Sequence, residues 1–208
     1  MADSKNKNAE EIVFRGIGVS GGVVTGPAYV ILPELIQVGR REIDKADVPM
    51  EVRRLEEAVI ETRRQVRELK QNMAKEASGG HAGILDAHLM VLDDRALMSE
   101  VVDGIRKERR NAESVLFDAG EKYADMLASV KDEYLRERVS DVKDVVRRII
   151  RNLRGDSRLF YEDLKEKHIL VARDLAPSDT AALQKDLVAG FATDLGSPTS
   201  HTAVMARA

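Results

Sequence analysis

The chain has 208 residues, 43% of them hydrophobic, which is enough to bury one large core or two smaller ones. Its 33 basic and 36 acidic residues give a formal net charge of −3, which disfavours nucleic acid and anionic membranes as partners. Because the chain has no cysteine, disulfides, thiolate catalysis and cysteine-ligated zinc are excluded.

Residues 1–11, MADSKNKNAEE, are polar, and we expect them to form a disordered tail. They have no apolar stretch of the kind found in signal peptides and membrane anchors, so we expect a cytoplasmic protein. Residues 12–32 are rich in β-branched side chains and contain five glycines without a helical period, which predicts two short strands joined by turns. The GVSGG stretch is not a phosphate-binding loop, because no Lys-Ser/Thr pair follows it.

Residues 44–155 show the apolar periodicity of an antiparallel helical bundle. A long first helix is predicted to begin near Asp47 and Pro49, and the pair Asp93-Asp94 and Asn111 are candidate caps for later helices. Gly155 is predicted to end the last helix. The charged runs RKERR and RERVSDVKDVVRR are predicted to form solvated faces. The apolar stripe of the first helix consists of Val52, Leu55, Val59, Thr62, Val66, Leu69 and Met73.

Strand-like composition returns at residues 168–173 and 187–194, and the segment between them is predicted to contain a short helix. The early strands are too few to form a stable sheet alone, so we expect them to pair with these late strands. The fold class is therefore α/β plus all-α. We expect a discontinuous α/β domain formed by residues 12–43 and 156–208, with residues 44–155 inserted as the bundle.

His201 stands in the segment GSPTSHTAVMARA, between small or hydroxylated residues and a predicted helix. Backbone N–H groups at a helix start suit an anion, and an imidazole is a nucleophile at neutral pH. This arrangement points to a phosphohistidine, and the alternative is a histidine that only caps or lines the helix. No two of the four histidines have zinc-protease spacing, so we predict no metal site.

The same segment resembles the phosphohistidine signature of the phosphoenolpyruvate-utilising phosphotransferases, a Gly-x-x-Ser/Thr-x-His core followed by Ala-Arg. Further stretches are similar, in the same order, to the enzyme I branch of that family: GIGVSGGVVTGPAYV, DAHLMVLDD, DEYLRERVSDVKDVVRRIIRNLRG and DLAPSDTAAL. The resemblance covers nearly the whole chain after the tail. It implies a swivel-type phosphohistidine α/β domain, truncated on its C-terminal side, that carries an inserted helical domain for binding the phosphocarrier protein HPr.

The resemblance also implies roles for single residues. His201 is expected to take a phosphoryl group on Nε2 and to pass it to the active histidine of HPr. Thr180 matches the threonine whose hydroxyl bonds that imidazole. Arg207 matches the Ala-Arg of the signature, and it is expected either to bind phosphate oxygens or to form a helix-capping salt bridge. The other residues expected around the phosphate are Thr199, Ser200 and Thr202.

The resemblance places the HPr-docking surface on the helices. A histidine on an otherwise apolar helix face is usually a core residue, and that alternative stays open for His88. Glycines at 79–80, Arg95 and Ala96 stand where the docking face often carries glutamates, and Pro198 replaces a commonly basic residue. The implied docking residues are His88, Met90, Val91, Leu97 and Arg138.

Members of this family bind phosphoenolpyruvate and Mg²⁺ in a barrel domain, and they dimerise through it. No stretch of this sequence resembles that barrel, so we expect this chain at most to exchange phosphate with HPr. Two alternatives remain open. One is a non-enzymatic helical adaptor, which would need neither Thr180 nor Ser200. The other is an enzyme I-like segment of another phosphoryl-transfer system, such as the dihydroxyacetone kinase donor.

Overall fold

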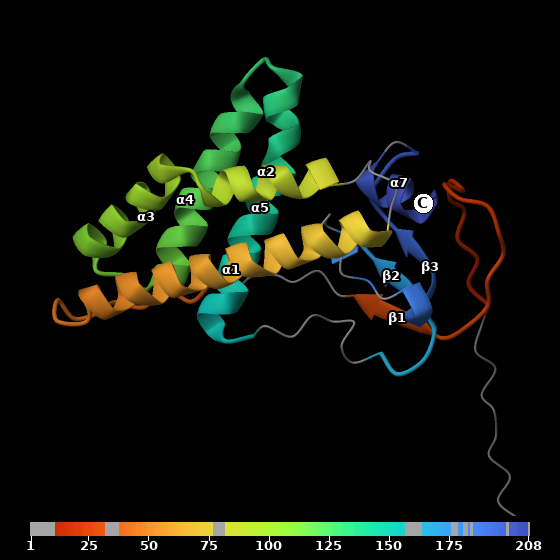
Figure 1. The fold of residues 1–208 in the computed structure, drawn as a ribbon, viewed down its shortest axis with the longest axis horizontal. Coiled ribbons are helices and arrows are strands. Elements are labelled where there is room, and N and C mark those ends of the chain that lie inside the picture. The colour runs from red at the N-terminus through yellow and green to blue at the C-terminus, as the bar shows by residue number, and fades with distance from the viewer. Residues whose placement is uncertain are drawn as a thin grey trace, which may run out of the picture.

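The structure is a computed structural model, and it describes residues 11–31, 38–76, 82–156, 164–175, 179–180, 183, 185–198 and 200–207. A bundle of helices lies beside a small parallel sheet (Figure 1). The helices are α1 (Val48–Glu76), α2 (Ala82–Leu92), α3 (Arg95–Glu108), α4 (Ala112–Ser129), α5 (Glu133–Arg154) and α7 (His201–Arg207). The strands are β1 (Ala28–Ile31), β2 (His168–Ala172) and β3 (Val188–Thr193), and a 3-10 turn, Lys185–Leu187, precedes β3.

The sheet has the order β1-β2-β3, and both pairings are parallel. Ala28 of β1 lies opposite Ile169 of β2, so a strand from before the helices pairs with one from after them, as predicted. Of the two early strands predicted, one is present as β1, and the other is not, because residues 11–27 form no strand. Phe14 is 86% exposed there, and a strand needs a neighbour to accept its backbone hydrogen bonds.

The predicted helix boundaries are largely confirmed. The Asp94 carboxylate caps α3 by accepting hydrogen bonds from the N–H of Ala96, at 2.8 Å, and of Leu97, at 3.1 Å. Gly155 follows α5 with a φ of +71°, the left-handed conformation that commonly ends a helix. Asn111 precedes α4 as predicted, but its side chain makes no capping bond. The side-chain oxygen of Asn111 accepts instead from the backbone N–H of Arg41, at 3.0 Å.

Two separate groups of buried apolar side chains form the cores. The bundle core includes the predicted α1 stripe, since Val66 is fully buried and Leu55 is 2% exposed. The side chain of Met73, at the end of that stripe, lies outside the described residues. The second core lies under the sheet, where Leu170 packs with Tyr29 and other partly buried side chains. The bundle and the sheet are therefore each stabilised by apolar contacts of their own.

One charged run departs from its prediction. RERVSDVKDVVRR was expected to be solvated, but Asp141, Asp144 and Arg148 within it are 7%, 5% and 4% exposed. Their spacing of three and four residues places them on one side of α5, and Val142 and Val145 beside them are also fully buried. The buried face of α5 is thus wider than an apolar stripe alone, and it includes charged groups.

Candidate functional site

His201 is the first residue of α7, which confirms the predicted position of this histidine at a helix start. The preceding turn is held by a hydrogen bond of 3.0 Å from the N–H of Ser200 to the carbonyl of Ser197. Gly196, with a φ of +134°, adopts a backbone conformation that side chains rarely allow. The side chain of His201 and the whole of Thr199 lie outside the described residues. The backbone therefore places residue 201 at the junction of this turn and α7.

A second segment that carries a predicted site residue lies against α7. The hydroxyl of Thr202, the second residue of α7, donates to the backbone carbonyl of Leu175 at 3.3 Å. Leu175 stands five residues before Thr180, which is 6% exposed and helical together with Asp179. Figure 1 shows α7 close to the ends of β2 and β3. The fold thus brings the stretch that leads to Thr180 next to the helix that begins at His201.

The hydroxyl groups beside His201 have structural partners. Ser200 Oγ accepts a hydrogen bond of 3.2 Å from the N–H of Ala203, so Ser200 caps α7. Thr202 is 5% exposed, and its hydroxyl bonds Leu175 as described above. Ser200 is half-buried, so of these two hydroxyls it is the more accessible to a phosphate.

Arg207, at the end of α7, reaches back over the turn before His201. Its Nη2 donates to the carbonyl of Pro198 at 2.8 Å, and its Nη1 donates to the carbonyl of Val19 at 3.1 Å. Within the described part of the chain Arg207 makes no ion pair, so the expected capping salt bridge is not seen there. Arg207 instead ties the His201 turn to the N-terminal segment.

The predicted docking residues divide between surface and core. Met90 is 68% exposed, and the Arg138 side chain is 28% exposed. Val91 and Leu97 were expected on an exposed apolar patch, but they are 9% and 1% exposed, so that expectation is wrong. His88 is 0% exposed, which is the core alternative that the sequence left open. Positions 88 and 91 face the bundle core one helical turn apart, whereas position 90 faces away from it. Glycines 79 and 80 lie outside the described residues.

Buried charges join α2 to α5. His88 Nε2 lies 2.8 Å from Asp144 Oδ2, and Arg138 Nη1 donates to Asp141 Oδ2 at 3.1 Å. Burial raises the pKa of Asp141, whereas the positive charges of His88 and Arg138 oppose that shift, and the negative charge of Asp144 adds to it. The two aspartates escape prediction from the sequence because the density of charges around them is typical of a solvated face. Their one-sided spacing beside buried valines is the signal that indicates them.

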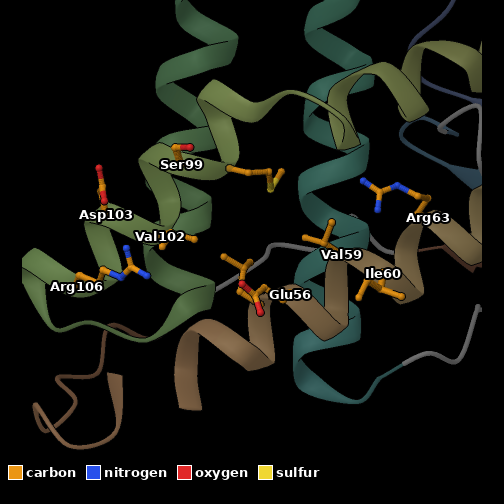
Figure 2. A pocket seen from close by; sticks show the side chains of 10 residues that line it. Glu56, Val59, Ile60, Arg63, Ser99, Val102, Asp103 and Arg106 are labelled. Atoms are coloured by element: carbon orange, nitrogen blue, oxygen red, sulfur yellow. The ribbon is translucent and has the colours of Figure 1, made fainter. Parts of the chain in front are cut away.

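A groove of about 470 Å³ opens between α1 and α3 on another part of the bundle. In Figure 2, Asp103 and Arg106 lie toward one end of this groove and Arg63 toward the other. Leu97 directly precedes two lining residues, Met98 and Ser99, but no predicted site residue lines the groove itself. The groove is therefore not part of the candidate site. Its lining residues are Leu55, Glu56, Val59, Ile60, Arg63, Met98, Ser99, Val102, Asp103 and Arg106.

Among the described residues, no three or more His, Asp or Glu side chains gather in a way that would hold a metal ion. None of the described helices has the length and apolar character that a membrane crossing requires.

Comparison with known proteins identifies the family. The N-terminal domain of PEP-utilising enzymes matches residues 15–138, and their mobile domain matches residues 164–208, which include His201. The chain belongs to the PEP-utilising enzymes. Proteins named phosphoenolpyruvate-protein phosphotransferase from Listeria monocytogenes and Bacillus subtilis are each 36% identical to it over 194 residues. These alignments cover 93% of this chain and 34% of each relative, so the chain spans about a third of their length.

Solved structures of PEP-utilising enzymes share the fold. A solution structure of Enzyme I superposes with a TM-score of 0.76 at 37% identity, covering 92% of this chain and 77% of that one. The N-terminal domain of the nitrogen-type Enzyme 1 superposes with a TM-score of 0.67 at 27% identity, covering 91% and 77%. The predicted resemblance to enzyme I is confirmed, as is the coarse fold of helices with a small parallel sheet.

Proposed function

We propose that this chain carries a phosphoryl group on Nε2 of His201 and exchanges it with the active histidine of HPr. The observation that carries the proposal is the Thr202–Leu175 hydrogen bond, which joins the helix beginning at His201 to the stretch leading to Thr180. The match to the mobile domain over residues 164–208 and the names of the relatives support it.

In the proposed step, the lone pair of His201 Nε2 attacks the phosphorus of phosphorylated HPr. An N–P bond forms as the bond to the HPr histidine breaks, and the reverse step returns the group. The Thr180 hydroxyl is proposed to hydrogen-bond the His201 ring and to orient it for transfer. Ser200 is the proposed hydroxyl neighbour of the phosphate. Arg207 acts by holding the Pro198 carbonyl and with it the turn that presents the histidine.

Docking is proposed to use the bundle, with Met90 of α2 as an apolar anchor and Arg138 of α5 as a cation. Methionine and arginine side chains are both enriched at protein interfaces. Arg95 and Ala96, at the exposed start of α3, stand where relatives in the family often place acids. Apolar contact is therefore expected to contribute more to HPr affinity than charge does.

Phosphoenolpyruvate as the original phosphoryl donor, Mg²⁺ as its cofactor and dimer formation are proposed for the complete enzyme, in the cytoplasm. The relatives are about three times as long as the matched region, since it covers 34% of them.

The test mixes the purified chain with HPr phosphorylated on its active histidine and follows transfer of radioactive phosphate. We expect a label that is labile in acid and stable in base, and that disappears in His201→Ala. His168→Ala is the matched control. His168 contacts the carbonyl of Glu166 and lies far from α7 in the sequence, so this variant should still be labelled on His201. HPr binding without any label would instead favour the helical-adaptor alternative.

A further inference from the structure

Four ionisable residues, three of them buried, form a cluster across the seam between α2 and α5. His88, on α2, contacts Asp144, on α5, at 2.8 Å. Asp141 lies three residues earlier on α5 and accepts from Arg138 at 3.1 Å. His88, Asp141 and Asp144 are at most 7% exposed, whereas Arg138 reaches the surface. The cluster therefore runs from the bundle core to its rim.

Such a cluster strongly favours one arrangement of its side chains. Buried carboxylates lose their hydration, and they remain ionised only where positive groups and hydrogen-bond donors surround them. Arg138 provides a cation for Asp141, and His88 places a ring nitrogen within hydrogen-bond distance of Asp144. Any shift of α2 along α5 would separate His88 from Asp144 and leave both buried without this contact. A satisfied polar network of this kind specifies a single packing of the two helices.

The two helices joined by the cluster carry both proposed docking residues. Met90 lies two positions after His88 and is exposed on α2, and Arg138 pairs directly with Asp141. The cluster thus fixes an apolar anchor on one helix relative to a cation on the other. The ion pair with Asp141 also restricts the rotamers of the long Arg138 side chain before a partner arrives, which lowers the cost of ordering it on binding.

We propose that Asp141 and the His88–Asp144 pair are positioning residues for docking: they hold Arg138 and Met90 at the spacing that the phosphocarrier protein recognises. The partner surface that fits offers an apolar patch to Met90 and hydrogen-bond acceptors to Arg138. This inference rests on the proposed docking of HPr to the bundle, and it assigns the specificity of that docking to residues that do not themselves reach the surface.

The test is a double-mutant cycle in HPr affinity, measured by isothermal titration calorimetry. Asp141→Asn should raise Kd about three- to tenfold, the change expected when one long side chain must be ordered on binding. In an Arg138→Ala background, Asp141→Asn should change Kd by less than about 1.5-fold, because the side chain that it positions is already absent. Lys143→Ala is the matched control on α5, since its pair with Glu121, at 3.0 Å, is exposed and should leave Kd unchanged.

The outcomes separate this inference from the proposed function. Absence of HPr binding by the unmodified chain would refute the docking proposal itself. Binding that Asp141→Asn weakens equally with and without Arg138 would overturn the inference, because it would show only a general structural effect. Should Asp141→Asn fail to give a folded amide NMR spectrum, Asp141→Glu keeps the charge but displaces it by one methylene, and the same cycle applies. Unchanged affinity in the folded variant would also overturn the inference.

Discussion

Arg54 is expected to contribute more to the stability of the bundle than any exposed arginine on the same helix. Its Nη1 donates to the Glu51 carboxylate at 2.8 Å, and its Nη2 donates to Glu113 at 2.8 Å and to the carbonyl of Leu153 at 3.0 Å. The Glu51 carboxylate also accepts from the N–H of Ala112, at 2.7 Å, at the start of α4. One guanidinium thereby connects α1 with the start of α4 and the end of α5.

The size of the Arg54 contribution to the free energy of unfolding follows from the burial of its two glutamate partners. Glu51 is 3% and Glu113 9% exposed, so Arg54→Met would leave two buried carboxylates without their cation. Breaking a fully buried ion pair from one side costs about 3–5 kcal/mol of unfolding free energy, and because the Arg54 side chain is itself 34% exposed we expect a loss at the lower end, about 3 kcal/mol. Arg64, on the same helix, also contacts two glutamates, at 2.6 and 2.5 Å, but these pairs are exposed. Arg64→Met should therefore cost no more than about 1 kcal/mol.

The pH dependence gives a second readout of the same interaction. Burial raises the pKa of Glu113, but hydrogen bonds from its own backbone, Arg54 and Asn111 together lower it below the ordinary value of 4.5. A lowered pKa in the folded state contributes stability above pH 4.5, and this contribution is lost as the pH falls through the folded pKa. In Arg54→Met fewer groups oppose the effect of burial on Glu113, so its carboxylate is less stable in the folded variant, and protonation at low pH removes that cost. The difference in unfolding free energy between the unmodified chain and Arg54→Met should therefore narrow as the pH falls.

Urea denaturation followed by far-UV circular dichroism, at pH 7 and again near pH 4, measures both effects. The m-values of the two variants should match that of the unmodified chain, so that a shift in midpoint reports stability. A loss for Arg54→Met no larger than that for Arg64→Met would refute the reasoning from burial. A gap between Arg54→Met and the unmodified chain that stays constant or widens at low pH would refute the proposed role of Glu113.

Three further predictions concern packing, capping and transfer. Gly120→Ala would place a Cβ 2.7 Å from Val146 Cγ2, and we expect a net loss of about 1–2 kcal/mol that Val146→Ala largely restores in a thermal melt. Asp94→Ala removes the cap of α3 and the acceptor of the Tyr123 hydroxyl, so we expect a loss of about 1–2 kcal/mol, and the pKa of Tyr123, now about 12, should fall in a spectrophotometric titration. Thr180→Val should slow phosphoryl transfer in quench-flow assays while changing stability by about 1 kcal/mol, and an unchanged transfer rate would contradict the proposed role of Thr180.

Sequence periodicity predicts the helices of this protein well because each one buries an apolar stripe. The α1 stripe and the cap of α3 by Asp94 follow directly from residue spacing and type. The early strands are harder to predict from the sequence, because a strand forms only beside a partner strand, and the tertiary fold decides which strands are partners. For the docking residues, the sequence indicates the helix but not the face of the helix on which each side chain lies. Only the packing shows that His88 points inward and Met90 outward.

The two halves of the proposed activity lie over separate cores. Met90 and the His88–Asp144 pair belong to the bundle, whereas His201 begins a helix that contacts the segment after β2. The bundle core and the sheet core share no buried residue. A substitution that disturbs one core should therefore leave the other folded, so that docking and phosphoryl acceptance can be weakened independently. This separation requires two results. His201→Ala should lose the label while its affinity for HPr is unchanged. Met90→Ala should lose affinity for HPr while its labelling at saturating HPr is unchanged.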